Sequence, residues 1–327
     1  MRCLVTGVTG QDGSIIAEQL IDQGHEVHGV VRRRSNPRLD NIEHLDKLKL
    51  HTADICDQTS LDRVFAEVQP DEAYALAAQS FVGASFTQPA YTVQATALGI
   101  LHVLESVRRI SPHTRLYVAG SSEQFGATPP PHNEQSRFHP RSPYGCAKVM
   151  AHDMARVYRE AYNLFVVVGI LGNHESIRRG VEFLTRKVAI GVAEIAHGRK
   201  SHLELGNLDA KRDWGWANDY TRAMQLMLRV NEPKDYVVGT GECYTVREFV
   251  EYALQAVELQ PDIERYVKVN PLFVRPAEVD VLRLDSSLIR KELGWVPTVT
   301  FRDLVTTMVQ HEWLRIQNEE AAISAGY

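Results

Sequence analysis

The sequence predicts an α/β fold, with a doubly wound parallel sheet followed by a smaller C-terminal lobe. Short apolar runs alternate with helical patterns between residues 3 and 171, and a glycine-rich turn lies at the first junction of strand and helix. The chain of 327 residues also exceeds the usual size of one domain. An appended lobe is therefore expected.

The expected elements of the first half alternate strictly. Strands are expected at 3–5, 26–31, 72–77, 115–119 and 165–171, and helices at 15–23, 60–68, within 91–109 and at 143–161. Strands separated by helices run parallel in one sheet.

The alternation loses its regularity after Leu171. We expect an N-terminal domain at 1–171 and the second lobe mainly at 172–327. Helices are expected at 181–197, just before Gly294, and at 301–314, where apolar residues recur at three- and four-residue spacing. The tail after Gln317 is expected to fray.

Composition excludes several classes of protein. The net charge of −5 argues against general binding to nucleic acid or to an anionic membrane. The four cysteines form no Cys-x-x-Cys pair, which speaks against a zinc site or a disulfide framework and fits a reduced cytoplasm. We expect no metal, no signal peptide and no membrane span, since no run of about 18 apolar residues occurs.

The turn after the first strand has the pattern Gly7-x-x-Gly10-x-x-Gly13. Glycines there permit a tight turn and close approach of the backbone to a pyrophosphate at the helix N-terminus, as in a Rossmann-type dinucleotide site. We expect the loop residues Gly7, Thr9, Gly10, Gln11, Asp12 and Gly13 to hold a cofactor. An ordinary glycine-rich turn is the alternative.

The second strand ends in Arg32, Arg33 and Arg34 instead of the acidic residue typical of an NAD site. Guanidinium groups match a 2′-phosphate, so the sequence favours NADP. A solvated charge run or a subunit contact is the alternative. Asp54, after the third strand, is placed to meet the adenine, or to serve as an N-cap or turn residue.

Tyr144 and Lys148 lie one helical turn apart and share a face. An ordinary tyrosine has a pKa of about 10, so ionising it at neutral pH costs roughly 4 kcal/mol. A neighbouring ammonium and a positive nicotinamide both lower that cost. After a dinucleotide loop this pair predicts a base for hydride transfer at a carbinol carbon, although the spacing alone often means only a helix surface.

Ser121 and Glu123 follow the strand at 115–119, whose carboxyl end should face the nicotinamide. Alternate residues on an extended backbone point to one side, so both side chains are expected to face substrate. Glu123 would supply a second base. The alternative is a carboxylate at a helix start or on the surface.

Two later regions are rich in basic residues near aromatic ones, in a chain that is acidic overall. They are 173–180 with 185–187, and 209–214 with 275–278. Such clusters indicate a phosphorylated, base-bearing substrate, with solvated salt bridges as the alternative.

These motifs resemble the extended short-chain dehydrogenase/reductases and, among them, the GDP-mannose 4,6-dehydratase family. The likeness covers nearly the whole chain and rests on residues 6–14, 30–33, 77–80, 141–145, 173–176, 206–215 and 275–280. The run 206–215 is the most specific of these.

The resemblance implies a 4,6-dehydration, in which oxidation at C4 is followed by loss of water across C5 and C6 and by return of the hydride to C6. It assigns Tyr144 and Lys148 to C4 oxidation, Glu123 to removal of the C5 proton, and Ser121 or Glu123 to departure of the C6 hydroxyl. It adds Ile55, Leu76, Ala78, Ser80, Tyr144, Lys148 and His174 to the NADP site. It assigns Ser80, Asn173, Lys187, Arg212, Arg275 and Glu278 to the GDP-sugar.

The resemblance also implies a homodimer or homotetramer, with Arg33 near the facing subunit, and a return of 216–238 to the first domain. The chain departs from the family pattern at Gly120, Ser121, Gly172, Ile177 and Trp216. Because Gly172 and Ile177 flank Asn173, a GDP-heptose or GDP-amino sugar stays open as substrate. Two further functions stay open as well: a nucleotide-sugar 4-reductase or epimerase, which needs no C5 base, and a cofactor-binding scaffold protein without turnover.

Overall fold

The computed structural model describes residues 1–33, 39–273 and 276–324. Its centre is a seven-stranded parallel sheet with the order β11-β6-β5-β4-β1-β2-β3. The strands are β1 (Arg2–Thr6), β2 (Glu26–Val31), β3 (Lys49–Thr52), β4 (Glu72–Ala75), β5 (Arg115–Ala119), β6 (Val166–Leu171) and β11 (Tyr236–Val238). The predicted doubly wound α/β fold is confirmed.

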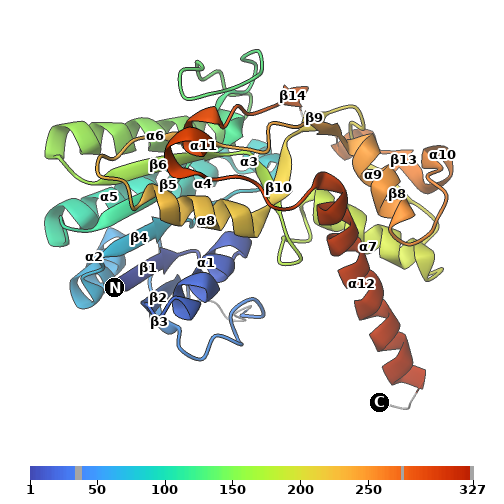
Figure 1. Ribbon diagram of the computed structural model, residues 1–327, viewed down its shortest axis with the longest axis horizontal. Helices are drawn as coiled ribbons and strands as arrows, with labels where there is room; N and C mark the ends of the chain where they lie inside the picture. The colour runs from blue at the N-terminus through green and yellow to red at the C-terminus, as the bar shows by residue number, and fades with distance from the viewer. Residues whose placement is uncertain (34–38, 274–275, 325–327) are drawn as a thin grey trace.

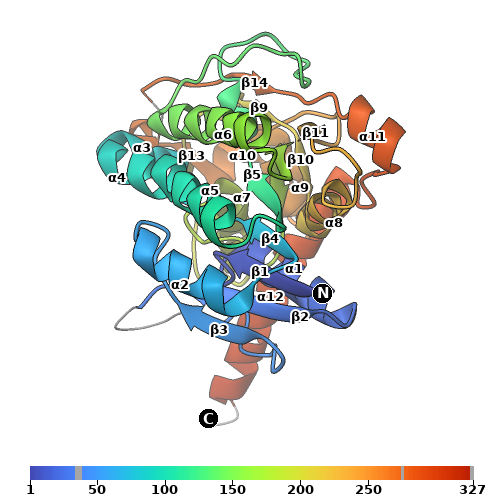
Figure 2. The ribbon, with the colours of Figure 1, turned by 90° about the vertical axis from the view of Figure 1, so that its left-hand side faces the viewer.

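Helices cover both faces of this sheet (Figures 1 and 2). One face carries α2 (Gln58–Val68), α5 (Gly99–Ile110) and α6 (Pro143–Tyr162), and their apolar residues form one core with the sheet. The other carries α1 (Gln11–Asp22), α8 (Ala217–Met227) and α11 (Ser287–Leu293), which form a second core. The short helices α3 (Val82–Thr87) and α4 (Pro89–Val93) lead through a π-helical turn, Gln94–Leu98, into α5.

The C-terminal lobe has a third apolar core, built mainly from three helices. These are α7 (Leu184–Ala196), α9 (Val246–Gln255) and α12 (Phe301–Ser324), accompanied by the short α10 (Ile263–Tyr266). Small sheets pair β7 (Asn173–Glu175) with β10 (Trp214–Trp216), β8 (Leu203–Leu205) with β13 (Val267–Val269), and β9 (Lys211–Arg212) with both β12 (Tyr244–Thr245) and β14 (Val281–Leu282).

The helices of the C-terminal lobe differ from expectation at some of their ends. The first helix of the lobe begins at Leu184 rather than at residue 181. The helix before Gly294 ends at this glycine as expected, and the glycine has the left-handed φ of +64°. The closing helix continues to Ser324, so the prediction of a frayed tail after Gln317 is wrong for residues 318–324. The buried apolar residues of this helix end at Ile316. Beyond it, Glu319 and Glu320 form ion pairs with Arg199, and Glu320 also bonds His197. These polar contacts hold the last turns of the helix. Among the described helices, none has the length and apolar character of a membrane span.

Candidate active site

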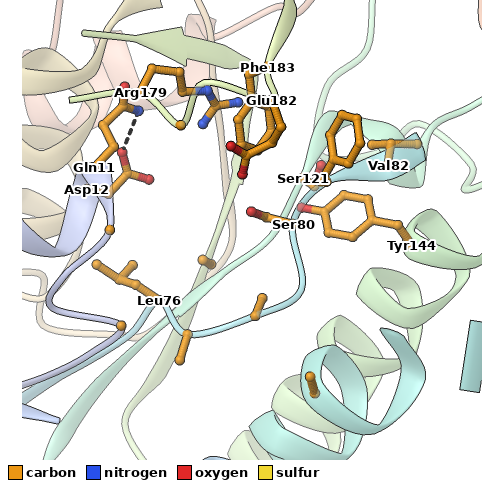
Figure 3. A pocket seen from close by; sticks show the side chains of 18 of the residues that line it. Gln11, Asp12, Leu76, Ser80, Val82, Ser121, Tyr144, Arg179, Glu182 and Phe183 are labelled. Atoms are coloured by element: carbon orange, nitrogen blue, oxygen red, sulfur yellow. Dashed lines mark hydrogen bonds between the residues drawn. The ribbon is translucent and has the colours of Figure 1, made fainter. Parts of the chain in front are cut away.

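A cavity of about 1330 Å³ lies at the carboxyl ends of the central strands, under the C-terminal lobe (Figure 3). Its walls come from the loops that follow β1, β4, β5 and β6, from the lobe segment 205–214, and from Leu272, Phe273, Pro276 and Glu278. In an open α/β sheet this edge is where ligands bind. The topology therefore gathers into one cavity the motifs that are far apart in the chain.

The glycine loop leaves no space for a side chain at Gly7 or at Gly13. Gly7 has φ +71°, and a Cβ there would lie 2.9 Å from the backbone nitrogen of Ala77. A Cβ at Gly13 would lie 2.2 Å from the carbonyl oxygen of Gly7. Gly10 ends the loop as the N-cap of α1, without a side-chain cap. The loop thus leaves the N-terminus of a 12-residue helix open to an anion, which fits a dinucleotide pyrophosphate.

The side chains of Gln11 and Asp12 bridge the loop to β7. The amide of Gln11 donates to the carbonyl of His174 at 3.0 Å and accepts from the hydroxyl of Ser176 at 2.9 Å. Asp12 Oδ2 and His174 Nε2 lie 2.9 Å apart. Burial alone raises the pKa of Asp12, but the His174 ring outweighs it and lowers this pKa. The pKa of His174 is correspondingly raised, because Asp12 outweighs the burial that lowers it.

Two arginines predicted to bind the cofactor lie at one edge of the cavity, after β2. Arg32 and Arg33 are exposed at its edge, and Arg32 donates to the hydroxyl of Tyr91 at 2.8 Å. Arg34 lies outside the described residues. Asp54 lines the cavity and accepts from the backbone of Cys56 at 2.9 Å, so it does hold a turn. Its alternative role as an N-cap is wrong, because Asp57 caps α2.

Several smaller predicted cofactor residues also line the cavity. Thr9, on the glycine loop, lies beside Gly10, and Ile55 follows Asp54. Leu76, Ala78 and Ser80 lie on the loop after β4, where Figure 3 shows Ser80 beside Ser121 and Tyr144.

Tyr144 lies in the first turn of α6, which Ser142 caps by accepting from the backbone of Gly145 at 3.0 Å. Burial raises the pKa of Tyr144 to about 12, although a hydrogen bond with Ser121 works against this. The ammonium of Lys148 donates to the carbonyl of Ala119 at 2.7 Å and lies 5.8 Å from the Tyr144 ring centre. Burial lowers the pKa of Lys148 to about 8. The sequence predicted that Lys148 lowers the pKa of Tyr144. Without a cofactor the pKa of Tyr144 is raised instead, because burial outweighs the effects that lower it.

Ser121 and Glu123 lie at a 3₁₀ turn, Ser122–Gln124, directly after β5. Ser121 is the N-cap, and its Oγ accepts from the backbone nitrogen of Glu123 at 3.3 Å. Glu123 lines the cavity and is only 8% exposed. Of the two alternatives for Glu123, a surface carboxylate is wrong, whereas a position at a helix start is confirmed, because Glu123 lies in the first turn of this 3₁₀ helix.

Gly145 brings the turn and the helix together. A Cβ on Gly145 would lie 2.8 Å from the carbonyl oxygen of Glu123, closer than real Cβ contacts. The glycine that follows Tyr144 therefore sets the approach of α6 to the turn and hence the separation of Tyr144 from Glu123.

The predicted substrate residues lie across the cavity from the sheet. Asn173 pairs with Trp214 where β7 meets β10. Arg212 is buried and donates to the carbonyl of Val279 at 2.8 Å, with Glu278 at 3.3 Å. The remaining members are Lys187, whose ammonium lies 3.7 Å from the ring centre of Phe273, and Arg275, which lies outside the described residues.

The sequence placed Arg179 in the basic cluster 173–180 but did not predict its contacts on the segment that crosses the cavity. The guanidinium of Arg179 lies 3.6 Å from the ring centre of Phe183 and 3.0 Å from the carboxylate of Glu175 (Figure 3). Phe183 in turn meets Phe81 edge to face, with 5.7 Å between ring centres. The four-residue spacing of Glu175, Arg179 and Phe183 is the sequence signal that could have indicated these contacts. The signal is weak because the three residues do not lie in a regular helix, where such spacing places side chains on one face.

Two departures from the family pattern, Gly172 and Ile177, flank Asn173. Gly172 lines the cavity, whereas Ile177 is not among the described residues of the lining. A Cβ on Gly172 would lie 3.0 Å from Leu284 and 3.4 Å from the hydroxyl of Tyr220, two buried residues that are not in the described lining either. A side chain at 172 would therefore meet the packing behind β7.

A metal centre is not supported by the arrangement of the side chains. In the described part of the chain no cluster of His, Cys, Asp and Glu has the arrangement of a metal site.

Comparison with known proteins agrees with this geometry. The family model described as GDP-mannose 4,6 dehydratase matches residues 4–308. The chain is 46% identical to GDP-mannose 4,6 dehydratase 2 of Arabidopsis thaliana, over 99% of this chain and 90% of that protein. It is 44% identical to the human GDP-mannose 4,6 dehydratase, over 94% of this chain and 90% of that protein.

Solved structures share the fold. The UDP-glucose 4-epimerase of Thermus thermophilus, solved with NAD, matches with a TM-score of 0.84 and 27% identity, over 95% of this chain and 99% of the other. The dTDP-glucose 4,6-dehydratase of Streptomyces venezuelae, also with NAD, has a TM-score of 0.84 at 24% identity, over 98% of each chain, and supports the fold alone. The full-length identity and the family model together establish that this chain belongs to the GDP-mannose 4,6-dehydratase family.

Proposed function

We propose that this protein is an NADP-dependent hydro-lyase that converts GDP-mannose to its GDP-4-keto-6-deoxy sugar. The family membership supports this substrate. The observation that carries the chemistry is the buried pairing of Tyr144 and Glu123, on a helix and a turn held in contact at Gly145. A simple dehydrogenase has no use for the second base.

Each protein group has a defined task in this reaction. The loop from Gly7 to Gly13 would hold NADP, whose nicotinamide would supply the acceptor for the C4 hydride and the donor for C6. Tyr144 takes the C4 hydroxyl proton, helped by its hydrogen bond with Ser121. Lys148, fixed on the carbonyl of Ala119, supplies positive charge beside the tyrosine.

The new C4 ketone makes the C5 proton acidic, and the Glu123 carboxylate removes it. The C6 hydroxyl then leaves as water, with a proton from Ser121 or from Glu123. Because a tyrosine of pKa about 12 costs roughly 7 kcal/mol to ionise at neutral pH, the positive charges of Lys148 and of the oxidised cofactor would have to stabilise the Tyr144 phenolate before it takes the C4 hydroxyl proton.

The test of this function is incubation of the purified protein with GDP-mannose and other GDP-hexoses and GDP-heptoses, without added reductant. Mass spectrometry should find the GDP-mannose mass reduced by one water, with no net change in cofactor redox state. Conversion of a GDP-heptose alone would move the assignment to that substrate. Epimerised or reduced product without loss of water would contradict dehydration.

We propose NADP over NAD because Arg32 and Arg33 lie at the edge of the cavity, where a 2′-phosphate would sit. Extraction of the bound cofactor should yield NADP. Arg33→Asp should weaken NADP binding and leave NAD binding little changed. Recovery of NAD alone would overturn this assignment.

We further propose a homodimer or homotetramer and a cytoplasmic location, the latter supported by four cysteines in the thiol state. Residues 1–171 would bind the cofactor, together with 216–238, whose strand β11 pairs with β6. Residues 172–327 would mainly bind the GDP-sugar. Light scattering after size exclusion measures the oligomer directly.

A further inference from the structure

We propose that Gln124, His152 and Asp235 form a positioning device that holds the Ser121–Glu123 turn in its productive geometry and releases it when His152 takes up a proton. This inference rests on the proposed function, because the turn is what it positions for dehydration. These three residues lie outside the lining of the cavity. We call them the Gln124 chain.

The Gln124 chain runs from the catalytic turn through α6 to the strand at the edge of the sheet. Gln124 Oε1 accepts from the backbone nitrogen of Ser121 at 2.8 Å, and Gln124 Nε2 lies 3.2 Å from His152 Nδ1. His152 Nε2 lies 3.2 Å from Asp235 Oδ2. Gln124 is fully buried and His152 is 7% exposed, so water does not replace these bonds easily.

The donors and acceptors fix the state of each member. The backbone nitrogen of Ser121 can only donate, so it must face the amide oxygen of Gln124, and the amide nitrogen must then face His152. An amide nitrogen only donates, so His152 Nδ1 must be an unprotonated acceptor. His152 is therefore neutral, with its proton on Nε2 toward Asp235.

The Asp235 carboxylate can accept a hydrogen bond from the protonated Nε2 of His152. Burial raises its pKa, but the bonds from His152 and Arg159 outweigh burial and lower the pKa to about 2. Arg159 Nη1 donates to Asp235 Oδ1 at 2.7 Å. The charged groups around the ring are thus the Asp235 carboxylate, before β11, and the Arg159 guanidinium, on the ring's own helix. Gln124 and Phe138, which meets the ring at 5.0 Å, are neutral.

Gly120 makes room for this arrangement. A Cβ there would lie 3.0 Å from Gln124 Oε1 and 2.8 Å from the carbonyl oxygen of Gly169. The glycine at 120, where the family commonly has serine, is therefore matched to the amide of Gln124.

A second proton on His152 places two donors face to face. The amide of Gln124 must then turn over to offer its oxygen to His152, and the Ser121 backbone nitrogen loses its acceptor. Acidification that protonates His152 should therefore loosen the Ser121–Glu123 turn, although neither catalytic side chain has itself been protonated.

Two substitutions at Gln124 separate this mechanism from simple packing. Gln124→Leu removes both bonds at similar volume, and kcat should fall roughly 10- to 100-fold at every pH while KM for GDP-mannose stays within about twofold. Gln124→Glu provides oxygens for both Ser121 and a protonated His152, so kcat should be largely retained at pH 6, where the parent protein declines. Asp153→Asn, on the exposed side of α6, is the control and should match the parent.

A second readout does not need turnover. Hydrogen–deuterium exchange of the peptide covering residues 119–125 should be faster in Gln124→Leu than in the parent or in Asp153→Asn. A rise in KM with unchanged kcat, identical pH profiles in the parent and Gln124→Glu, or unchanged exchange in Gln124→Leu would each overturn the proposal. If the parent protein does not dehydrate GDP-mannose at all, the proposed function fails, and the exchange result still decides whether the Gln124 chain holds the turn.

Discussion

Glu123 carries the distinction between a dehydratase and its redox relatives. Its substitution by glutamine keeps the volume of the buried side chain but removes the base that accepts the C5 proton. We expect Glu123→Gln to lower kcat for dehydration by roughly 100-fold or more, a typical contribution of a positioned base.

The same variant should still oxidise C4, because Tyr144 and Lys148 are intact. A stopped-flow trace should therefore show transient absorbance of reduced cofactor that is not followed by water loss. Solvent deuterium should no longer enter C5. Full activity in Glu123→Gln would favour the epimerase or reductase alternative.

Lys148 shows how function opposes stability at one position. It is 4% exposed, and its pKa is lowered to about 8. The unfolded chain therefore binds a proton more strongly between about pH 8 and 10.5, so this residue destabilises the fold below pH 8 and the penalty fades as pH rises toward 10.5.

We accordingly expect Lys148→Met to abolish turnover. The cofactor-free variant should also gain on the order of 1–3 kcal/mol in unfolding free energy at pH 7, which a higher thermal midpoint would show. The gain should shrink when the comparison is repeated near pH 10. The exposed Lys200→Met serves as control and should change neither quantity. A midpoint that falls at pH 7 would contradict the assigned burial cost.

At the scale of elements, the contact between α6 and the catalytic turn is the critical one. Gly145→Ala places a Cβ 2.8 Å from the carbonyl oxygen of Glu123, and neither atom belongs to a flexible side chain. The overlap should cost about 1–3 kcal/mol of stability, which the helix preference of alanine offsets only in part, and kcat should fall roughly 10-fold or more from misplacement of Tyr144.

Kinetics and thermal unfolding should be measured together on Gly145→Ala. The exposed neighbour Cys146→Ala is the matched control, since it also gains helix preference but does not create the contact. Equal kcat in the two variants would show that this contact does not set the catalytic geometry.

Two kinds of ion pair join α7 and the residues that follow it to α12, and they should differ in their contribution to stability. Arg186 meets the buried carboxylate of Glu312 in the lobe core, whereas Arg199 meets Glu319 and Glu320 near the surface. Removing one partner of a buried pair leaves a desolvated charge, so Arg186→Ala should cost about 3 kcal/mol.

Glu319→Gln with Glu320→Gln should cost below about 1 kcal/mol, because exposed pairs contribute little. Denaturant unfolding of both variants gives the comparison. A larger loss from the surface pair would mean that the last turns of α12 hold the lobe together, which their exposure does not support.

For the whole molecule, the sequence predicted the parallel sheet because strands and helices that alternate at this spacing have few other solutions. It also predicted the cavity motifs, since glycine loops and Tyr-x-x-x-Lys pairs are local. It included Arg179 in a basic cluster but missed its contact with Phe183, because that contact depends on how an irregular segment crosses the cavity. It also misjudged Tyr144, because the cost of burying a phenol depends on packing from distant elements.

Two side chains in the first turn of α1 join it to a strand more than 160 residues away, as the bonds of Gln11 and Asp12 with His174 show. The proposed cofactor site is thereby bonded to the strand that begins with Asn173, a residue proposed to bind the GDP-sugar. Any factor by which the cofactor tightens the GDP-sugar must, by thermodynamic reciprocity, be the factor by which the GDP-sugar tightens the cofactor. If that factor exceeds one, the substrate holds the cofactor most firmly while the 4-keto intermediate awaits its hydride.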